Sequence, residues 1–126
     1  MKKIMVFGVF DKLHEGHLNF LRQAKKHGDY LMAVIARDQN VLQAKKRLPR
    51  ETELTRLKNI QQLKMVNQAI LGYKYYKNRS KIVSKFNPQI ICLGYDQAIL
   101  KLKNKNIQII HLKPYKAKKY KSSLML

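Results

Sequence analysis

The sequence is poor in cysteine and in acidic residues. Its 126 residues include one cysteine, Cys92, and seven aspartates and glutamates against 27 lysines and arginines. A lone cysteine can form no internal disulfide and cannot supply the ligands of a zinc finger, which fits a protein of the reducing cytoplasm. Because Cys92 lies in an apolar run at residues 90–93, we interpret it as a small buried core residue rather than a reactive thiol.

Long apolar runs are also absent. No stretch of about 18 apolar residues occurs, so no transmembrane helix is expected. An apolar run begins at residue 4, which leaves no room for a signal peptide. With 45% hydrophobic residues and no internal repeat, the chain fits one domain with one core. We therefore expect a single cytoplasmic domain over residues 1–126, ending in a basic tail at 113–126 and without a membrane partner.

The excess of cations gives a formal net charge of +20. Two explanations compete. One is nucleic-acid binding through phosphate contacts, and the other is a general lysine bias combined with a site for anionic small molecules. The chain lacks the aromatic and basic array of an RNA-recognition motif. We favour the second explanation.

Apolar runs alternate with helical patterns along the chain. Residues 17–27 show helical spacing, with Leu18, Leu21 and Ala24 on one face and Gly28 at the end. Strands that alternate with helices predict an α/β fold, a doubly wound, Rossmann-like parallel sheet of about five strands with helices on both faces. The expected strands are 4–10, 30–36, 66–71, 89–93 and 107–112, and the expected helices are 17–27, 40–46, 52–63, 78–86 and 96–102.

In such sheets ligands bind beyond the carboxyl ends of the strands. Three strings follow predicted strands, at residues 8–17, 36–38 and 94–97. We expect them to meet at one edge of the sheet.

The string GVFDKLHEGH at residues 8–17 carries the strongest functional signal. It places His14 and His17 three residues apart, close to glycines and directly after an apolar run. A strand-to-helix turn with glycines lets backbone N–H groups approach phosphate oxygens. Two histidines at its mouth can donate hydrogen bonds to charge that develops on a reacting phosphate. The pattern indicates nucleotide phosphate chemistry, and the simpler interpretation is a turn with two surface histidines.

This string resembles the HxGH nucleotidyltransferases, the cytidylyltransferase-like family, in the longer form GxFDxLHxGH. The resemblance implies transfer of a nucleotidyl group from a nucleoside triphosphate to the phosphate of a small molecule, with release of pyrophosphate. It implies that His14 and His17 stabilise the reacting α-phosphate. It also implies a divalent cation such as Mg²⁺, held mostly by the triphosphate. The residues that would approach the nucleotide are Val9, Phe10, His14, Glu15, Gly16 and His17.

Several cations follow the second predicted strand. In related cytidylyltransferases, lysines in this loop contact the phosphates, which points to Lys45 and Lys46 here, with Arg47 beside them. In a chain this rich in lysine, each can instead be a solvated charge. Arg56 lies in the string ELTR, which resembles an ExxR pair on a helix of the family. It either binds phosphate or forms an i,i+3 salt bridge with Glu53.

Three further strings resemble the archaeal-type FAD synthases, which are FMN adenylyltransferases. They are ARDQNV at 36–41, AILG at 69–72 and LGYDQ at 93–97. By this resemblance Asp96 binds the adenine nucleotide and Tyr115 contacts it. An aspartate at a strand end can accept hydrogen bonds from an amine or a ribose hydroxyl, and a tyrosine can stack on a base. A turn-forming aspartate and a core tyrosine are the simpler interpretations.

The end of the sequence departs from the family pattern. The family's serine-rich motif usually continues as a helix, whereas Ser122 and Ser123 are followed by three residues. The resemblance implies that these serines bind the triphosphate, and the short segment after them argues against that role. Lys118, Lys119 and Lys121 are the alternative phosphate ligands.

The leading hypothesis is an enzyme that transfers AMP from ATP to FMN, giving FAD and pyrophosphate. The alternative is a CTP-dependent glycerol-3-phosphate cytidylyltransferase, which the first motif cannot distinguish. A third hypothesis is a non-catalytic, basic nucleic-acid-binding relative, against which both histidines argue. Relatives are often dimers, so a homodimer is a further expectation.

Overall fold

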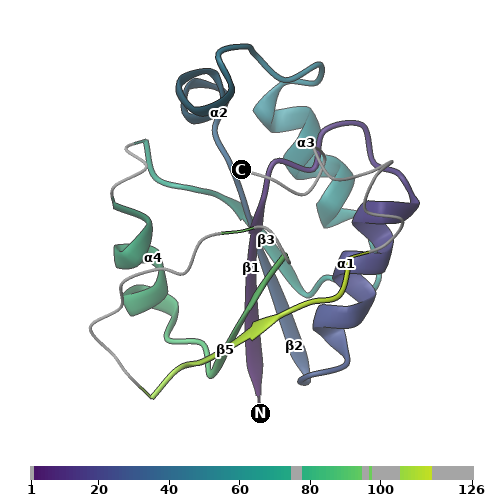
Figure 1. Ribbon diagram of the computed structural model, residues 1–126, viewed down its shortest axis with the longest axis vertical. Coiled ribbons are helices and arrows are strands. Elements are labelled where there is room, and N and C mark those ends of the chain that lie inside the picture. The colour runs from purple at the N-terminus through teal and green to yellow at the C-terminus, as the bar shows by residue number, and fades with distance from the viewer. Residues whose placement is uncertain (1, 75–77, 95–96, 98–105, 115–126) are drawn as a thin grey trace.

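A parallel sheet of five strands forms the centre of the computed structural model, which describes residues 2–74, 78–94, 97 and 106–114 (Figure 1). The strands are β1 (Lys3–Gly8), β2 (Tyr30–Ile35), β3 (Gln68–Leu71), β4 (Ile90–Leu93) and β5 (Gln108–His111). Their order across the sheet is β3-β2-β1-β4-β5, and every neighbouring pair is parallel. This confirms the doubly wound α/β fold, with the change of direction between β1 and β4.

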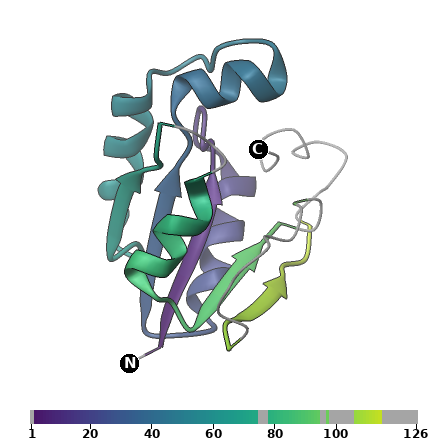
Figure 2. The same ribbon diagram turned by 90° about the vertical axis from the view of Figure 1, so that its left-hand side faces the viewer.

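The helices of the described residues are α1 (Glu15–Lys25), α2 (Asp38–Lys45), α3 (Glu53–Gln61) and α4 (Arg79–Phe86). Figure 2 shows α4 in front of the sheet and α1 behind it. Of these helices, none combines the length and apolar character needed to cross a bilayer.

Successive side chains of β1 face opposite sides of the sheet. Ile4 and Val6 pack in a core with residues of α1 and α3, whereas Met5 and Phe7 pack in a core with residues of α4. Burial on both faces explains why the central strands are continuous apolar runs instead of alternating patterns. Cys92 in β4 is fully buried, and burial raises the pKa of its thiol to about 12. The interpretation of Cys92 as a core residue is therefore confirmed.

The expected elements that fall on described residues are all present, with shifted ends. The first strand was expected to reach residue 10, but β1 stops at Gly8 because Phe10 takes a positive φ of 54°. The first helix begins at Glu15, two residues before its expected start, because His14 caps it. The helix expected at 96–102 lies, apart from Gln97, outside the described residues.

The segments that leave the strands continue their hydrogen bonding at the carboxyl edge of the sheet. The N–H of Ala36 donates to the carbonyl of Gly8 at 2.9 Å, and that of Gly72 donates to Ile35 at 2.9 Å. On the other side of β1, the Gln97 side chain donates to the carbonyl of Phe7 at 3.2 Å. Residues 8–17, 36–38, 94 and 97 therefore gather at one edge, as the sequence predicts.

Candidate active site

The turn after β1 has an unusual backbone. Phe10 and Lys12 have positive φ values of 54° and 51°, a conformation that costs free energy for residues with a side chain. Gly8 makes room for it, because a Cβ on Gly8 would lie 2.6 Å from the ring of Phe10. The turn thus reverses the chain sharply between the strand and α1.

The Phe10 side chain belongs to the core. It is 1% exposed, and its ring centroid lies 5.8 Å from that of His17 and 6.3 Å from that of Phe20. Only the backbone of Phe10 is therefore left to approach a nucleotide. Val9, at 4% exposure, lies on the wall of the cavity described below.

The two histidines form a capping box at the start of α1. The N–H of Gly16 donates to Nδ1 of His14 at 3.0 Å, and the N–H of His14 donates to Nδ1 of His17 at 3.2 Å. The imidazole rings stack with centroids 4.0 Å apart and an angle of 20° between their planes. Backbone donors at the helix start therefore fix the position of both rings.

The same contacts select a tautomer. In a neutral imidazole one nitrogen accepts and the other carries the proton. Since Nδ1 accepts a backbone N–H in His14 and in His17, Nε2 is the protonated nitrogen of each neutral ring. Burial lowers the pKa of His14, which favours the neutral form. Nε2 of each neutral ring is thus an N–H donor. His14 lines the cavity beside the turn, whereas the His17 side chain is fully buried.

Gly16 and Glu15, which the resemblance places near the nucleotide, both have contacts within the protein. The N–H of Gly16 is engaged by His14, so this amide can reach a phosphate only by giving up the cap. Glu15 lies in the first turn of α1, where its negative charge interacts favourably with the positive end of the helix dipole. Its carboxylate lies 3.5 Å from the guanidinium of Arg22 on the surface.

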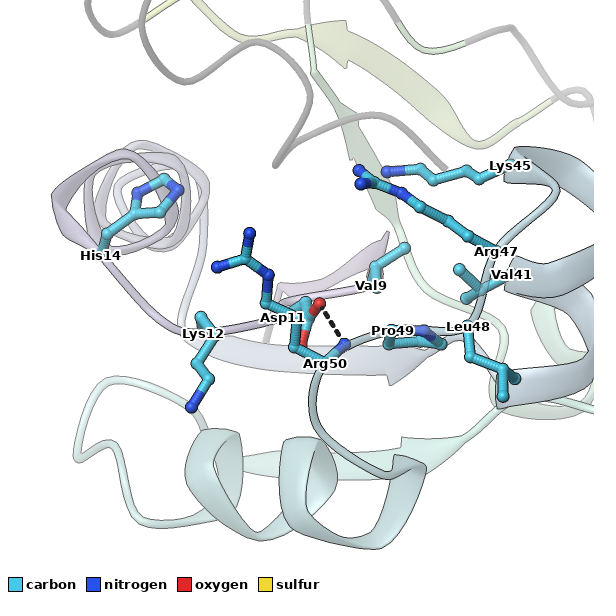
Figure 3. Close-up of a pocket in the computed structure, with 10 residues that line it drawn as sticks. All are labelled: Val9, Asp11, Lys12, His14, Val41, Lys45, Arg47, Leu48, Pro49 and Arg50. Atoms are coloured by element: carbon cyan, nitrogen blue, oxygen red, sulfur yellow. Dashed lines mark hydrogen bonds between the residues drawn. The ribbon is translucent and has the colours of Figure 1, made fainter.

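A cavity of about 280 Å³ opens beside the turn (Figure 3). One wall is the segment after β1, and the opposite wall is α2 with the loop that follows it. Apolar residues and cations share the lining, with one carboxylate, that of Asp11. The lining residues are Val9, Asp11, Lys12, His14, Val41, Lys45, Arg47, Leu48, Pro49 and Arg50.

The structure separates the two lysines of the prediction. Lys45, the last residue of α2, lines the cavity, whereas Lys46 caps the helix with φ of 63° and is not part of the lining. Figure 3 shows Lys45 and Arg47 extending toward the side on which His14 lies. Arg50, which no motif in the sequence singles out, also lines the cavity. Apart from the positive charge of Arg50, the sequence around it contains no motif that predicts a binding role.

Arg56 is fully buried and holds three segments together. Its guanidinium donates to the Val9 carbonyl at 2.8 Å, to the Glu51 carbonyl at 3.1 Å and to the Asp38 carboxylate at 2.6 Å. Among the described residues its ion pair is with Asp38 and not with Glu53. The predicted i,i+3 salt bridge with Glu53 is therefore absent among the described residues, and Arg56 instead joins the turn after β1, the start of α2 and the loop before α3.

The remaining predicted site residues lie outside the described residues: Asp96, Tyr115, Ser122 and Ser123. Their neighbour Gln97 is described. Its amide accepts from the Gly94 N–H at 2.7 Å and donates to Phe7, which joins the ends of β1 and β4. No group of three or more His, Cys, Asp or Glu within the described ranges is placed to hold a metal ion.

Comparison with known proteins identifies a family and several relatives of this chain. The model of the family described as cytidylyltransferase-like matches residues 5–122. A FAD synthase of Ferroglobus placidus is 42% identical over 97 residues, which cover 77% of this chain and 61% of that protein. A FAD synthase of Thermococcus sibiricus is 40% identical over 124 residues, covering 90% and 82%.

A solved structure is similar over most of the chain. It is the crystal structure of the lipopolysaccharide core biosynthesis protein from Thermoplasma volcanium GSS1, with a TM-score of 0.81 and 37% identity, covering 91% of this chain and 98% of that one. Against the first FAD synthases that it matches, this chain spans 61% to 66% of their length. The fold, the family model over residues 5–122 and the relatives at 40% identity or more together show that the chain belongs to the cytidylyltransferase-like family.

Proposed function

We propose that the chain is a nucleotidyltransferase that transfers AMP from ATP to FMN, giving FAD and pyrophosphate. The observation that carries the proposal is the pair of stacked histidines, with both Nδ1 atoms held by backbone amides, of which His14 lines a cavity that also has four cations in its lining. The similarity to FAD synthases supports ATP and FMN as the substrates.

The reaction needs no covalent intermediate on the protein. An oxygen of the FMN phosphate attacks the α-phosphorus of ATP, the bond from that phosphorus to the bridging oxygen breaks, and pyrophosphate leaves. Negative charge increases on the α-phosphate oxygens during the transfer. The Nε2–H groups of His14 and His17 would donate to these oxygens, and because the rings are already fixed, little reorganisation is needed.

The cations of the cavity would neutralise the phosphates. Lys45 and Arg47 extend from the wall opposite His14, and charge-assisted hydrogen bonds to phosphate are among the stronger contacts of a protein. Lys46 does not line the cavity, so it could contact the phosphates only if its side chain turned toward the cavity. We keep Asp96 and Tyr115 as proposed contacts of the adenine nucleotide and Ser122 and Ser123 as proposed contacts of the triphosphate, all four on the resemblance alone.

Mg²⁺ also remains part of the proposal. The carboxylate on the cavity wall, that of Asp11, accepts two backbone N–H groups, and the described residues offer no cluster of protein ligands. An ion at this site would therefore take most of its ligands from the triphosphate, whose charge it would neutralise. A homodimer and a cytoplasmic location stay predictions.

The test is to cross ATP and CTP with FMN and glycerol 3-phosphate in the presence of Mg²⁺, and to measure pyrophosphate and the nucleotidyl product. We expect product with ATP and FMN. His14→Asn keeps a side-chain acceptor for the helix cap and removes the imidazole, so it should lose activity by about 100-fold or more while remaining folded. His27→Asn, which changes an exposed histidine after α1, is the matched control and should be fully active.

The other outcomes each point elsewhere. Product with CTP and glycerol 3-phosphate would replace the proposal by the cytidylyltransferase alternative. No product with any pair, together with nucleic-acid binding that weakens steeply with salt, would favour the non-catalytic relative.

A further inference from the structure

Two carboxylates fasten the turn after β1 to the loop before α3. Asp11 accepts the backbone N–H of Arg50 at 2.8 Å and that of Glu51 at 2.9 Å. In the opposite direction, Glu51 accepts the backbone N–H of Lys12 at 2.8 Å and the side-chain amide of Asn59 at 3.3 Å. These contacts join segments about 40 residues apart in the sequence, at the point where Lys12 has a positive φ. The backbone of Arg50 is therefore fixed relative to the turn that leads to His14.

The side chain of Arg50 is positioned differently from that of Arg56. Arg56 is buried and its guanidinium is saturated by protein acceptors, whereas Arg50 is exposed and lines the cavity. In the view of Figure 3 the Arg50 guanidinium lies between the ring of His14 and the side chains of Lys45 and Arg47. Within the described part of the chain, no hydrogen bond or ion pair engages that guanidinium.

Asp11 holds the backbone at Arg50, yet it forms no ion pair with the Arg50 side chain. Both of its oxygens accept backbone amides, and it forms no ion pair with Arg50 among the described residues. The loop thus keeps a positive charge directed into the cavity at a fixed place. A guanidinium with a planar fork of donors matches the oxygens of a phosphate in a bidentate manner.

We propose that Arg50 binds a substrate phosphate in this cavity and that Asp11 is the residue that positions it. The inference rests on the proposed function for the identity of the ligand, FMN or ATP, but the chemistry recognised is the phosphate group in either case. Lys45 and Arg47 would contact the same anion from the opposite wall.

The experiment compares ligands that differ only in phosphate. Affinities of wild type and Arg50→Gln are measured at equilibrium, without turnover, for FMN against riboflavin and for ATP against adenosine. We expect Arg50→Gln to weaken FMN or ATP about tenfold or more, with little effect on riboflavin and adenosine. If the affinity for FMN alone falls, Arg50 binds the FMN phosphate, and if the affinity for ATP alone falls, it binds a phosphate of ATP. Lys81→Gln, which removes an exposed charge from α4 on the other side of the sheet, should change none of these affinities.

A double-mutant cycle tests the role of Asp11. If Asp11 acts by holding Arg50, Asp11→Asn should weaken the phosphorylated ligand in the wild-type background and have no further effect in the Arg50→Gln background. Arg50→Lys keeps the charge without the fork and should fall between wild type and Arg50→Gln. Thermal unfolding of each variant separates loss of binding from loss of fold.

The inference is overturned if Arg50→Gln leaves FMN and ATP affinities unchanged, if riboflavin and adenosine weaken equally, or if Lys81→Gln has the same effect. It fails for Asp11 alone if the effects of the two substitutions simply add. Failure of the proposed function is seen separately, as absence of FAD formation by wild type. Binding of inorganic pyrophosphate, a product of any nucleotidyl transfer, then tests Arg50 without reference to FMN or ATP.

Discussion

Each histidine of the candidate site has a structural task besides its proposed chemistry, because each Nδ1 holds a backbone amide of the helix start. Loss of either ring therefore changes two things, the donor to phosphate and the cap of α1. Substitution by asparagine at position 14 separates them, since asparagine is a good N-cap. Arg50 and Asp11 divide two similar tasks between them: the Arg50 side chain lines the cavity, and the Asp11 carboxylate holds the Arg50 backbone.

Protonation of His14 should destabilise the fold. Its folded-state pKa is lowered by burial, so at intermediate pH the unfolded chain binds more protons than the folded one, and stability decreases as pH falls. The full stability is present above the ordinary imidazole pKa and is lost as pH falls through the lowered folded value. Urea unfolding at about pH 8 and about pH 5 should show a larger loss for wild type than for His14→Asn. An equal loss in both proteins would contradict this expectation.

At the scale of elements, Arg56 joins the end of β1, the start of α2 and the loop before α3. The site depends on this junction because the cavity lies between the first and second of these segments. Reciprocal contacts strengthen it: the N–H of Asp38 donates to the Glu53 carboxylate at 2.9 Å, and the N–H of Glu53 donates to the Asp38 carboxylate at 3.2 Å. Each acidic residue thus serves the N-terminal turn of the other's helix.

Arg56→Met should lower the free energy of unfolding by about 3 kcal/mol or more. The substitution breaks a pair with a fully buried guanidinium and leaves the Val9 carbonyl without that donor. Urea denaturation with Lys58→Met as the control, at an exposed position of the same helix, measures the difference. If Lys58→Met lowered the free energy of unfolding by the same amount, the loss would come from α3 in general and not from the contacts of Arg56.

At the scale of the whole molecule, the net charge is +20, because 27 lysines and arginines stand against seven aspartates and glutamates. Three ion pairs join described residues to one another, and in two of them both side chains are partly exposed. Like charges on one small domain repel, which opposes the compact state. Part of the excess positive charge lies at the carboxyl edge of the sheet, where four cations and one carboxylate line the cavity.

Added salt should therefore stabilise the protein. Raising NaCl from about 20 mM to about 500 mM shortens the screening length, and the midpoint of thermal unfolding should increase by several degrees. Lys81→Gln, which lowers the net charge by one, should respond slightly less than wild type. A midpoint that is unchanged or lower in high salt would show that the repulsion is insignificant.

The sequence by itself determined the fold and the position of the first motif at the end of the first strand. Continuous apolar runs alternating with helical spacing define a parallel sheet with two buried faces, because local periodicity reports which side of an element meets the core. The GVFDKLHEGH string located His14 and His17 after the first strand, and the resemblance to cytidylyltransferases pointed to Lys45 and Lys46. The meeting of residues 8–17, 36–38 and 94–97 was predicted because residues that follow parallel strands lie at the same edge.

Only the tertiary structure decided which cations face the cavity and what the buried ones do. Lys45 and Lys46 are adjacent and chemically identical, yet only Lys45 lines the cavity, because the helix ends between them. Arg56 and Arg50 differ still more: one is saturated by Val9, Glu51 and Asp38, and the other is held by Asp11 with its guanidinium toward His14. Their contacts join residues far apart in the sequence, and local pattern carries no information about such pairings.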